Sequence, residues 1–217
     1  MLTVHAAPLV LPVGAAAVAE GAVAVEGDRI VALGPYDEVV RAHPAARVRR
    51  WPGVLTPGLR QWHAVWLLTR CYHPDPREAD ELGDRPLSGE AFERLAGGMD
   101  ATRWAGSVRR GLQQMLRNGT THLAGRFHDP SVRTAVARSG MTEVSALGAP
   151  GMLAGEPALD PFAEGRDLSG SAHGPLAVGG RADLAVFDVR DEAELRATGG
   201  AACVATVLGG RLVHRRR

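Results

Sequence analysis

The sequence predicts a mixed fold of the α+β / α/β class, with β-structure at both chain ends and alternating helices and strands between them. Gly27-Asp28 separates two apolar runs near the N-terminus, and Gly209-Gly210 separates two more near the C-terminus. Two-residue junctions of this kind are typical of tight hairpins, because glycine reaches positive φ at little cost. Between the hairpins, helix-like and strand-like stretches alternate. That alternation favours parallel strands joined by crossover helices.

The first 53 residues predict a small sheet. Residues 22–26 and 29–33 are the two arms of the first hairpin, and the polar stretch 36–46 spaces Val39 and Val40 as on one turn of helix. A short apolar run at 54–55 then meets a Pro-Gly turn.

Residues 66–87 are the least regular part of the chain. The prolines in Cys71–Pro76 exclude a helix there, and the charged run from Arg77 to Arg85 predicts a loop. Ser88 is a plausible N-cap for a short helix that ends near Gly97. A longer helix is predicted over 100–117, with a buried stripe formed by Trp104, Val108, Leu112, Met115 and Leu116.

The middle of the chain continues with a strand over 120–125, a helix capped by Asp129 with Pro130 at its first position, and a strand over 141–147. The span 148–175 is rich in Gly, Pro and Ala and predicts a linker or excursion loop. The tail predicts a strand over 182–189, a short helix over 191–196 and the second hairpin.

Composition excludes several functional classes. The net charge of +1 gives no reason to expect nucleic-acid or membrane binding. All 25 basic side chains are arginine, which rules out Schiff-base and carboxylated-lysine chemistry. The two cysteines are far apart and form no Cys-x-x-Cys pair, which favours a cytoplasmic setting. The abundance of Ala, Gly and Arg suggests a GC-rich bacterial source.

Three separated patches carry a family resemblance. The first runs from the 27–34 hairpin to Pro57-Gly58-Leu59 and His63; the second is Leu116-Arg117-Asn118-Gly119-Thr120-Thr121; the third is the Gly180–Asp188 stretch with the hairpin after it. In this order they resemble the amidohydrolase superfamily, of the imidazolonepropionase, guanine deaminase and aminodeoxyfutalosine deaminase type.

This resemblance implies a composite β-sandwich built from both chain ends and a (β/α)8 barrel that binds a catalytic metal. The expected domains are therefore 1–55 with 174–217 as the sandwich, 56–150 as a partial barrel-like segment, and 151–173 as a linker. Residues 56–173 fall far short of the roughly 200 residues that a whole barrel needs. We therefore expect a truncated, three-strand remnant of the barrel.

The metal site is where the sequence departs from the family. His63 matches the first histidine of the family's His-x-His pair, but Val65 stands at the second position and cannot ligate. If a metal is bound at all, the expected ligands are His63, Cys71, His73 and His122, and zinc or iron would be the metal. The expected catalytic groups are His63, His128 and Glu143. Each has a structural alternative: a locally bonded histidine, a loop residue and an exposed strand position.

Three functional hypotheses remain. The preferred one is a pseudoenzyme with no bound metal that serves as a binding or accessory protein, its ligand a small polar metabolite. The alternative is a metal-dependent hydrolase or deaminase acting on non-peptide carbon–nitrogen bonds of a small cyclic compound. The third is a site completed by association, with a homodimer as the expected assembly.

Overall fold

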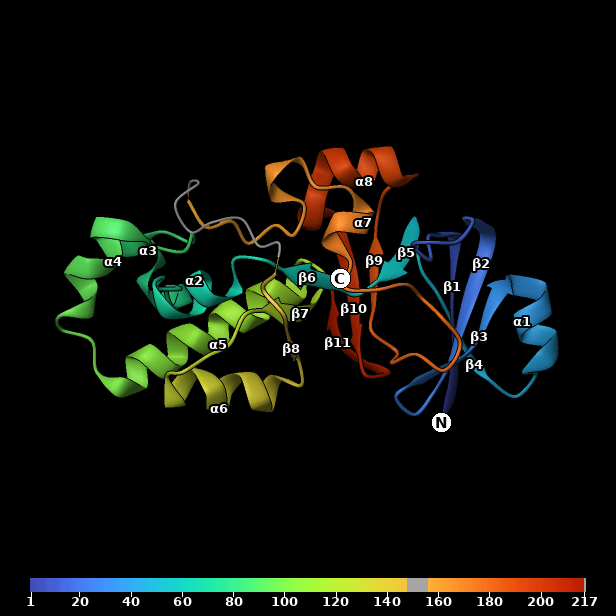
Figure 1. The fold of residues 1–217 in the computed structure, drawn as a ribbon, viewed down its shortest axis with the longest axis horizontal. Helices are drawn as coiled ribbons and strands as arrows, with labels where there is room; N and C mark the ends of the chain where they lie inside the picture. The colour runs from blue at the N-terminus through green and yellow to red at the C-terminus, as the bar shows by residue number, and fades with distance from the viewer. Residues whose placement is uncertain (148–155, 217) are drawn as a thin grey trace. The chain divides into compact units, whose positions relative to one another are not determined.

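The computed structural model describes residues 1–147 and 156–216 (Figure 1). Its strands are β1 (Leu2–Val10), β2 (Val18–Glu26), β3 (Arg29–Pro35), β4 (Arg47–Arg50), β5 (Val54–Pro57), β6 (Leu59–Gln61), β7 (Thr120–Ala124), β8 (Thr142–Val144), β9 (Leu184–Phe187), β10 (Cys203–Leu208) and β11 (Arg211–Arg215). The α-helices are α1 (Tyr36–Ala42), α2 (Ala64–Thr69), α3 (Ala79–Leu82), α4 (Gly89–Ala96), α5 (Ala101–Arg117), α6 (Pro130–Ser139), α7 (Leu168–Ser171) and α8 (Glu192–Thr198). Short 3-10 helices are η1 (Pro76–Glu78), η2 (Ala163–Gly165) and η3 (Gly199–Ala202).

The chain divides into two compact units. Unit 1 comprises Met1–Arg60, Leu116–Thr121 and Asp160–Arg217, and unit 2 comprises Gln61–Met115 and His122–Leu159. Within the described part of the chain, no helix combines the length and apolar character needed to cross a membrane.

Unit 1 contains a sheet made from both ends of the chain. Its strand order is β11-β10-β9-β5-β1-β2-β3, with β4 also paired to β1. The two ends join where β5 pairs antiparallel with β9, from Val54 opposite Phe187 to Pro57 opposite Leu184. Figure 1 shows the tail strands, in orange and red, beside β5.

Alternation along the strands gives this sheet two apolar faces. In β2, Val23 and Val25 enter one core cluster, whereas Ala22 and Ala24 enter another that also holds Val39 of α1. Adjacent strand residues point to opposite faces, so this split is what a sheet with two covered faces requires. The first cluster also takes residues from β3, β5, β9 and β10. Strands distant in the sheet order therefore share one core, which is a composite β-sandwich.

A second sheet has the order β6-β7-β8. Strands β7 and β8 are parallel, with His122 opposite Thr142, and α6 connects them. This is the expected parallel pair with a crossover helix. The predicted fold class, a composite sandwich with a partial three-stranded α/β segment, is confirmed.

Local differences from the sequence predictions have physical causes. The run Arg77–Arg85 contains η1 and α3 instead of a continuous loop, because Asp75 and Glu78 form a capping box that starts a turn. The strand predicted over 141–147 narrows to β8. Of the predicted linker 151–173, residues 151–155 lie outside the described residues. From Asp160 on it forms η2 and α7 and buries Phe162 and Leu168 in the core.

Candidate functional site

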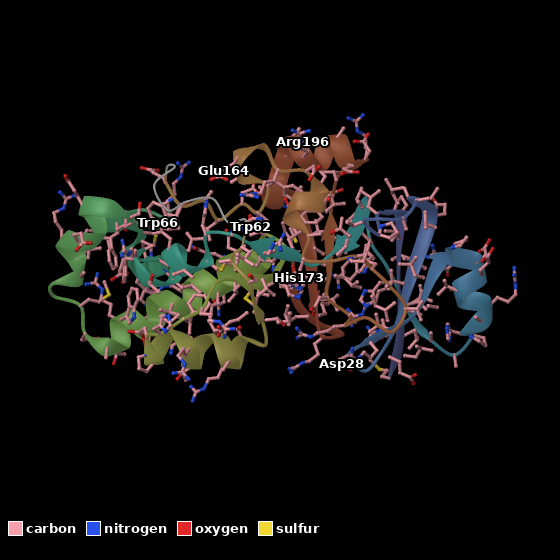
Figure 2. The ribbon with its side chains drawn as sticks, in the orientation of Figure 1. Asp28, Trp62, Trp66, Glu164, His173 and Arg196 are labelled. Carbon is pink, nitrogen blue, oxygen red and sulfur yellow. The ribbon has the colours of Figure 1, made fainter. Side chains whose placement is uncertain are left out.

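His63 lies directly after β6, at the N-cap of α2. Its backbone N–H donates to Gln61 Oε1 at 2.9 Å, and its Nδ1 accepts from the backbone N–H of Ala158 at 2.9 Å. Trp62 precedes it and Trp66 follows on α2, both half-buried (Figure 2). The sequence therefore places His63 at a strand end, and the structure commits one ring nitrogen to a backbone amide.

Val65 lies on the first turn of α2 and packs against Gly125, the residue after β7. A Cβ built on Gly125 would lie 2.3 Å from Val65 Cγ2, and Gly125 has φ +118°. Only glycine, which has no Cβ, can come this close to Val65. Residues with a side chain also rarely adopt this φ. The position of the family's second histidine is thus filled by an apolar side chain in tight contact with the end of β7.

A pocket of about 300 Å³ opens at the carboxyl ends of β7 and β8. We call it the strand-end pocket; its lining residues are Gly125, Arg126, Glu143, Val144, Ser145 and Ala146. The Gly125 N–H donates to the Val144 carbonyl at 2.9 Å and so joins the two strand ends. Arg126 and Glu143 are exposed and bring opposite charges to this pocket. Carboxyl ends of parallel strands are where barrel enzymes place their sites.

His73 is fully buried, and the protein engages both of its ring nitrogens. Nε2 lies 2.9 Å from the Leu67 carbonyl oxygen and Nδ1 lies 2.7 Å from Oε1 of the Gln114 side chain. Burial lowers the pKa of His73, which favours the neutral ring. A neutral imidazole offers one donor and one acceptor. Both partner atoms are oxygens, so the single N–H of the neutral ring donates to one of them. The other ring nitrogen also lies against the protein, which leaves no open nitrogen for a metal.

Cys71 is also buried, and burial raises the pKa of its thiol to about 12. The thiolate is the form that binds metals and attacks substrates. At neutral pH this side chain is a thiol, and its contribution is to packing.

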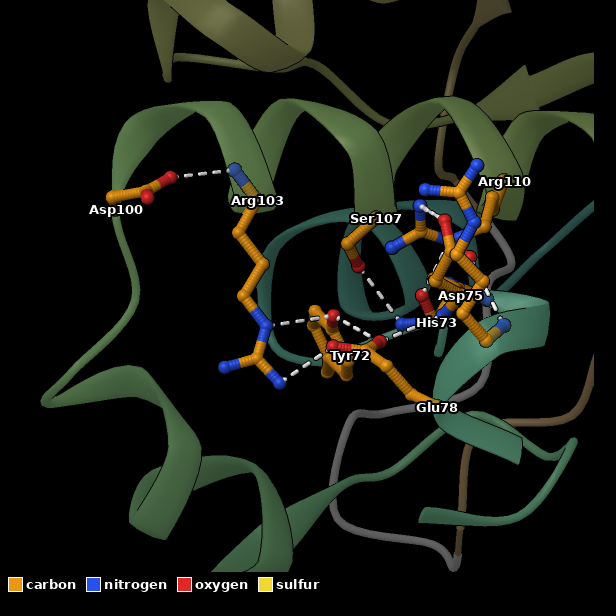
Figure 3. Close-up of polar contacts among 9 residues, drawn as sticks. Tyr72, His73, Asp75, Glu78, Asp100, Arg103, Ser107 and Arg110 are labelled. Carbon is orange, nitrogen blue, oxygen red and sulfur yellow. Dashed lines mark hydrogen bonds and ion pairs between the residues drawn. The ribbon is translucent and has the colours of Figure 1, made fainter. Parts of the chain in front are cut away.

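A polar network holds the segment 72–78 against α5 (Figure 3). Tyr72 OH donates to Glu78 Oε2 at 2.6 Å and accepts from Arg103 Nε at 2.9 Å. Ser107 Oγ accepts from the His73 backbone N–H at 2.8 Å, and Arg110 Nε donates to the His73 carbonyl at 2.8 Å. This segment, which lacks apolar periodicity, is therefore ordered by hydrogen bonds, and His73 and its neighbours belong to that framework.

The remaining predicted site residues have different surroundings. His122 is buried within β7, and His128 is exposed in the turn before α6. Asp129, next to it, is the N-cap of α6 and accepts from the N–H groups of Ser131 and Val132. Only Glu143 among the predicted catalytic residues lines the strand-end pocket. Asp183 Oδ1 accepts from Gly209 N–H at 2.7 Å, so this side chain helps to hold the second hairpin.

The residues do not fit the zinc or iron site that the resemblance implies. Zinc is held by three or four protein ligands. Val65 stands in the place of one ligand, and both ring nitrogens of His73 lie against protein oxygens. Cys71 stays protonated at neutral pH. Across residues 1–147 and 156–216, no three His, Cys, Asp or Glu side chains are grouped so as to hold a metal ion.

Sequence reasoning missed Arg126 and Ser145, which line the strand-end pocket. Both come soon after a strand end, and that position is the signal that could have found them. Gln114 was missed because its role depends on a tertiary contact with His73.

Comparison with known families gives one match. The model of the imidazolonepropionase-like composite domain of bacteria matches residues 21–46, which cover most of β2 and all of β3 and α1. No curated protein matches the chain.

Several solved structures resemble the fold. The E. coli guanine deaminase shares 15% identity and a TM-score of 0.46, over 67% of this chain and 36% of that one. An adenosine deaminase from Xanthomonas campestris, solved with bound zinc, shares 21% identity and a TM-score of 0.48, over 65% and 33%. The Helicobacter pylori aminofutalosine deaminase shares 16% identity and a TM-score of 0.37, over 58% and 29%. The chain thus spans about a third of the length of these structures.

The composite sheet and the matched segment coincide, since β2, β3 and α1 all belong to unit 1. The predicted resemblance to the imidazolonepropionase-like composite domain is confirmed over residues 21–46 by this match.

Proposed function

We propose that this chain is a divergent amidohydrolase-like protein that has lost the ancestral metal-dependent hydrolase site and serves as a binding or accessory protein. The observation that carries the proposal is the packing of Val65 against Gly125. The tight contact at the strand end leaves an apolar group where the family's second metal ligand would stand.

Metal analysis of the purified protein tests the first half of the proposal. We expect less than stoichiometric zinc or iron after dialysis against metal-free buffer. The variant Val65→His restores the His-x-His spacing with His63, so it is expected to bind zinc more tightly than the wild type. Stoichiometric metal in the wild type would overturn the proposal.

The ligand expected for the binding role is a small polar metabolite held in the strand-end pocket. Arg126 can pair with a carboxylate or phosphate, Glu143 can accept from an amine or amide, and Ser145 can do either. A volume of about 300 Å³ suits a compact molecule. Thermal shift across a panel of amino acids, ureido acids and cyclic amides is the screen.

Matched variants identify the pocket as the site of binding. Arg126→Ala and Glu143→Ala are each expected to abolish the shift caused by a hit, whereas Arg133→Ala on α6 is expected to leave it unchanged. A ligand that still causes its full thermal shift in both pocket variants would bind elsewhere, and this assignment would be refuted.

The alternative function is hydrolysis or deamination of a non-peptide carbon–nitrogen bond through a rebuilt or partner-completed site. The location of the strand-end pocket, at the carboxyl ends of two parallel strands, is what favours it. This alternative requires turnover that a chelator abolishes and that His63→Ala removes. Turnover unaffected by His63→Ala would exclude it.

A homodimer is the proposed assembly, because β6 and β8 are edge strands of a three-stranded sheet and such edges are usually covered. Sedimentation equilibrium tests this proposal directly. A chain that remains monomeric at every concentration tested would contradict it.

A further inference from the structure

Three arginines of unit 1, Arg47, Arg49 and Arg215, gather beside a buried His–Trp pair. Arg47 and Arg49 lie two residues apart on β4, and β4 runs parallel to β1 with Thr3 opposite Arg47 and His5 opposite Arg49. Residues two apart on a strand share one face, about 6.6 Å apart along the strand. Arg47 and Arg49 therefore project on the same side as His5.

Trp51 and Arg215 complete the group. Trp51 Nε1 donates to His5 Nδ1 at 3.1 Å, and the guanidinium carbon of Arg215, on β11, lies 5.7 Å from the centre of the Trp51 ring. His5 and Trp51 are both buried, at 2% and 8% exposure. The indole thus has a fixed orientation, and it positions Arg215 by a cation–π contact.

Arg49 is repelled by the positive charges of Arg47 and Arg215. The pKa of Arg49 is lowered mainly by burial and further by these two positive charges. Burial is the main cause that lowers the pKa of His5 to about 4, and the charge of Arg49 lowers it further. At neutral pH the histidine is therefore uncharged. Within the described residues, none of Arg47, Arg49 and Arg215 forms an ion pair. The chain as a whole carries only +1, so this positive charge is a local concentration.

We propose that Arg47, Arg49 and Arg215 form a binding site for a compact phosphate anion with two or more phosphate groups. Guanidinium groups bind phosphate oxygens through paired N–H donors. Three guanidinium groups have more N–H donors and more positive charge than one carboxylate can pair with. A di- or triphosphate has enough oxygens and enough negative charge for all three. The ligand is either inorganic or the phosphate chain of a nucleotide, because both present the same chemistry to the arginines.

Calorimetric titration of the full chain with pyrophosphate, and separately with ADP, tests the site and distinguishes the two sources. We expect one molecule bound per chain. Each of Arg47→Ala, Arg49→Ala and Arg215→Ala is expected to weaken binding by about tenfold or more, as the loss of a charged hydrogen bond implies. Arg41→Ala on α1 and Arg138→Ala on α6 are the matched controls, expected to change the Kd by less than about twofold.

A second measurement covers variants that fail to fold. In the wild type, the indole N–H resonance of Trp51 should shift on addition of pyrophosphate, while those of Trp62, Trp66 and Trp104 stay in place, because Arg215 lies over the Trp51 ring. Trp51→Phe assigns the resonance. No pyrophosphate or ADP binding, equal losses in the control variants, or a Trp51 resonance that does not move would each overturn the proposal. So would a single-stranded RNA bound far more tightly than pyrophosphate through the same arginines, which would make the surface a nucleic-acid site.

Discussion

At the residue scale, the contact between Val65 and Gly125 makes a sharp stability prediction. In Gly125→Ala the new methyl would overlap Val65 Cγ2, at 2.3 Å, and the backbone would stay at φ +118°. Overpacking and an unfavourable φ each cost about 1–3 kcal/mol, so we expect a total loss of about 2–6 kcal/mol. Urea denaturation measures it.

A double-mutant cycle separates the two costs. Adding Val65→Ala to Gly125→Ala removes the steric overlap but leaves the backbone strain, so it should recover only the steric part of the loss. Purely additive effects of the two substitutions would mean that residues 65 and 125 are not in contact. The tight packing of Val65 against Gly125 would then be refuted.

The buried ring of His73 gives a second prediction at this scale. A Cβ on Gly111 of α5 would lie 2.6 Å from His73 Nε2, the atom bonded to the Leu67 carbonyl. Gly111→Ala must displace the His73 ring and so break this hydrogen bond. An unsatisfied buried polar group costs about 1–3 kcal/mol, so we expect a loss of stability of that size.

Gly106 on the same helix supplies the matched control. There the nearest atom to a Cβ would be Arg110 Nη1, at 3.1 Å, so the Arg110 guanidinium, which is hydrogen-bonded to the His73 carbonyl and Asp75, need shift by only a few tenths of an ångström. Helix propensity favours alanine over glycine by about 0.5–1 kcal/mol. Gly106→Ala should therefore be neutral or stabilising in thermal and urea unfolding, and Gly111→Ala destabilising. The same sign for both variants would contradict the assigned role of His73.

At the element scale, Asp129 links helix capping to pH. The hydrogen bond from the Ser131 hydroxyl lowers the pKa of the Asp129 carboxyl most, and the bonds that the carboxylate accepts from Val132 N at 3.0 Å and Ser131 N at 2.8 Å lower it further. A carboxyl with a lowered folded-state pKa stabilises the fold above its unfolded pKa of about 3.9 and loses that contribution as the pH falls through the folded value.

Asp129→Ala should therefore cost about 1 kcal/mol at pH 7. The difference from the wild type should shrink as the pH is lowered below about 4. Urea unfolding from pH 7 to pH 3 measures both effects, and a difference that grows on acidification would contradict this role. Thr134→Ala, which removes a hydroxyl on the exposed face of the same helix, is the control.

Elements that follow from local rules are predictable from the sequence. The Gly27-Asp28 hairpin forms as expected, with Glu26 opposite Arg29. Helix α5 buries Val108, Leu112 and Met115 of its predicted stripe, whereas Trp104 and Leu116 are only partly buried. Helices α2 and α3 were not predicted, because they are too short to show periodicity. Segment 72–78 is fixed by Ser107 and Arg110 of α5, partners about 35 residues away.

The candidate site divides in the same way. His63 and Val65 could be recognised as the first and second ligand positions, because the Pro-Gly entry fixes their register. The engagement of His73 by Leu67 and Gln114 depends on tertiary contacts that no local pattern encodes. The strand-end pocket likewise needs β7 and β8 side by side.

At the scale of the whole molecule, unit 1 depends on both chain ends. Leu55 of β5 shares a core cluster with Leu184, Val186 and Val207 of the tail, and Phe187 is fully buried on the other face. Removing residues 184–217 would expose the first cluster and leave β5 without its partner β9. The N-terminal strands alone would then lack the apolar burial that offsets their conformational entropy.

We therefore expect residues 1–60 to lose amide protection when the tail is deleted, with hydrogen exchange as the measurement. The less drastic Phe187→Ala should cost about 3–5 kcal/mol, whereas Val213→Ala, at an exposed position of β11, should cost under about 0.5 kcal/mol. In Phe187→Ala, amides of β1 and β2 should lose protection together with those of β10. Protection that persists in β1 and β2 while β10 exchanges freely would show that the N-terminal strands are stable without the tail, and the two chain ends would then be separate folding units.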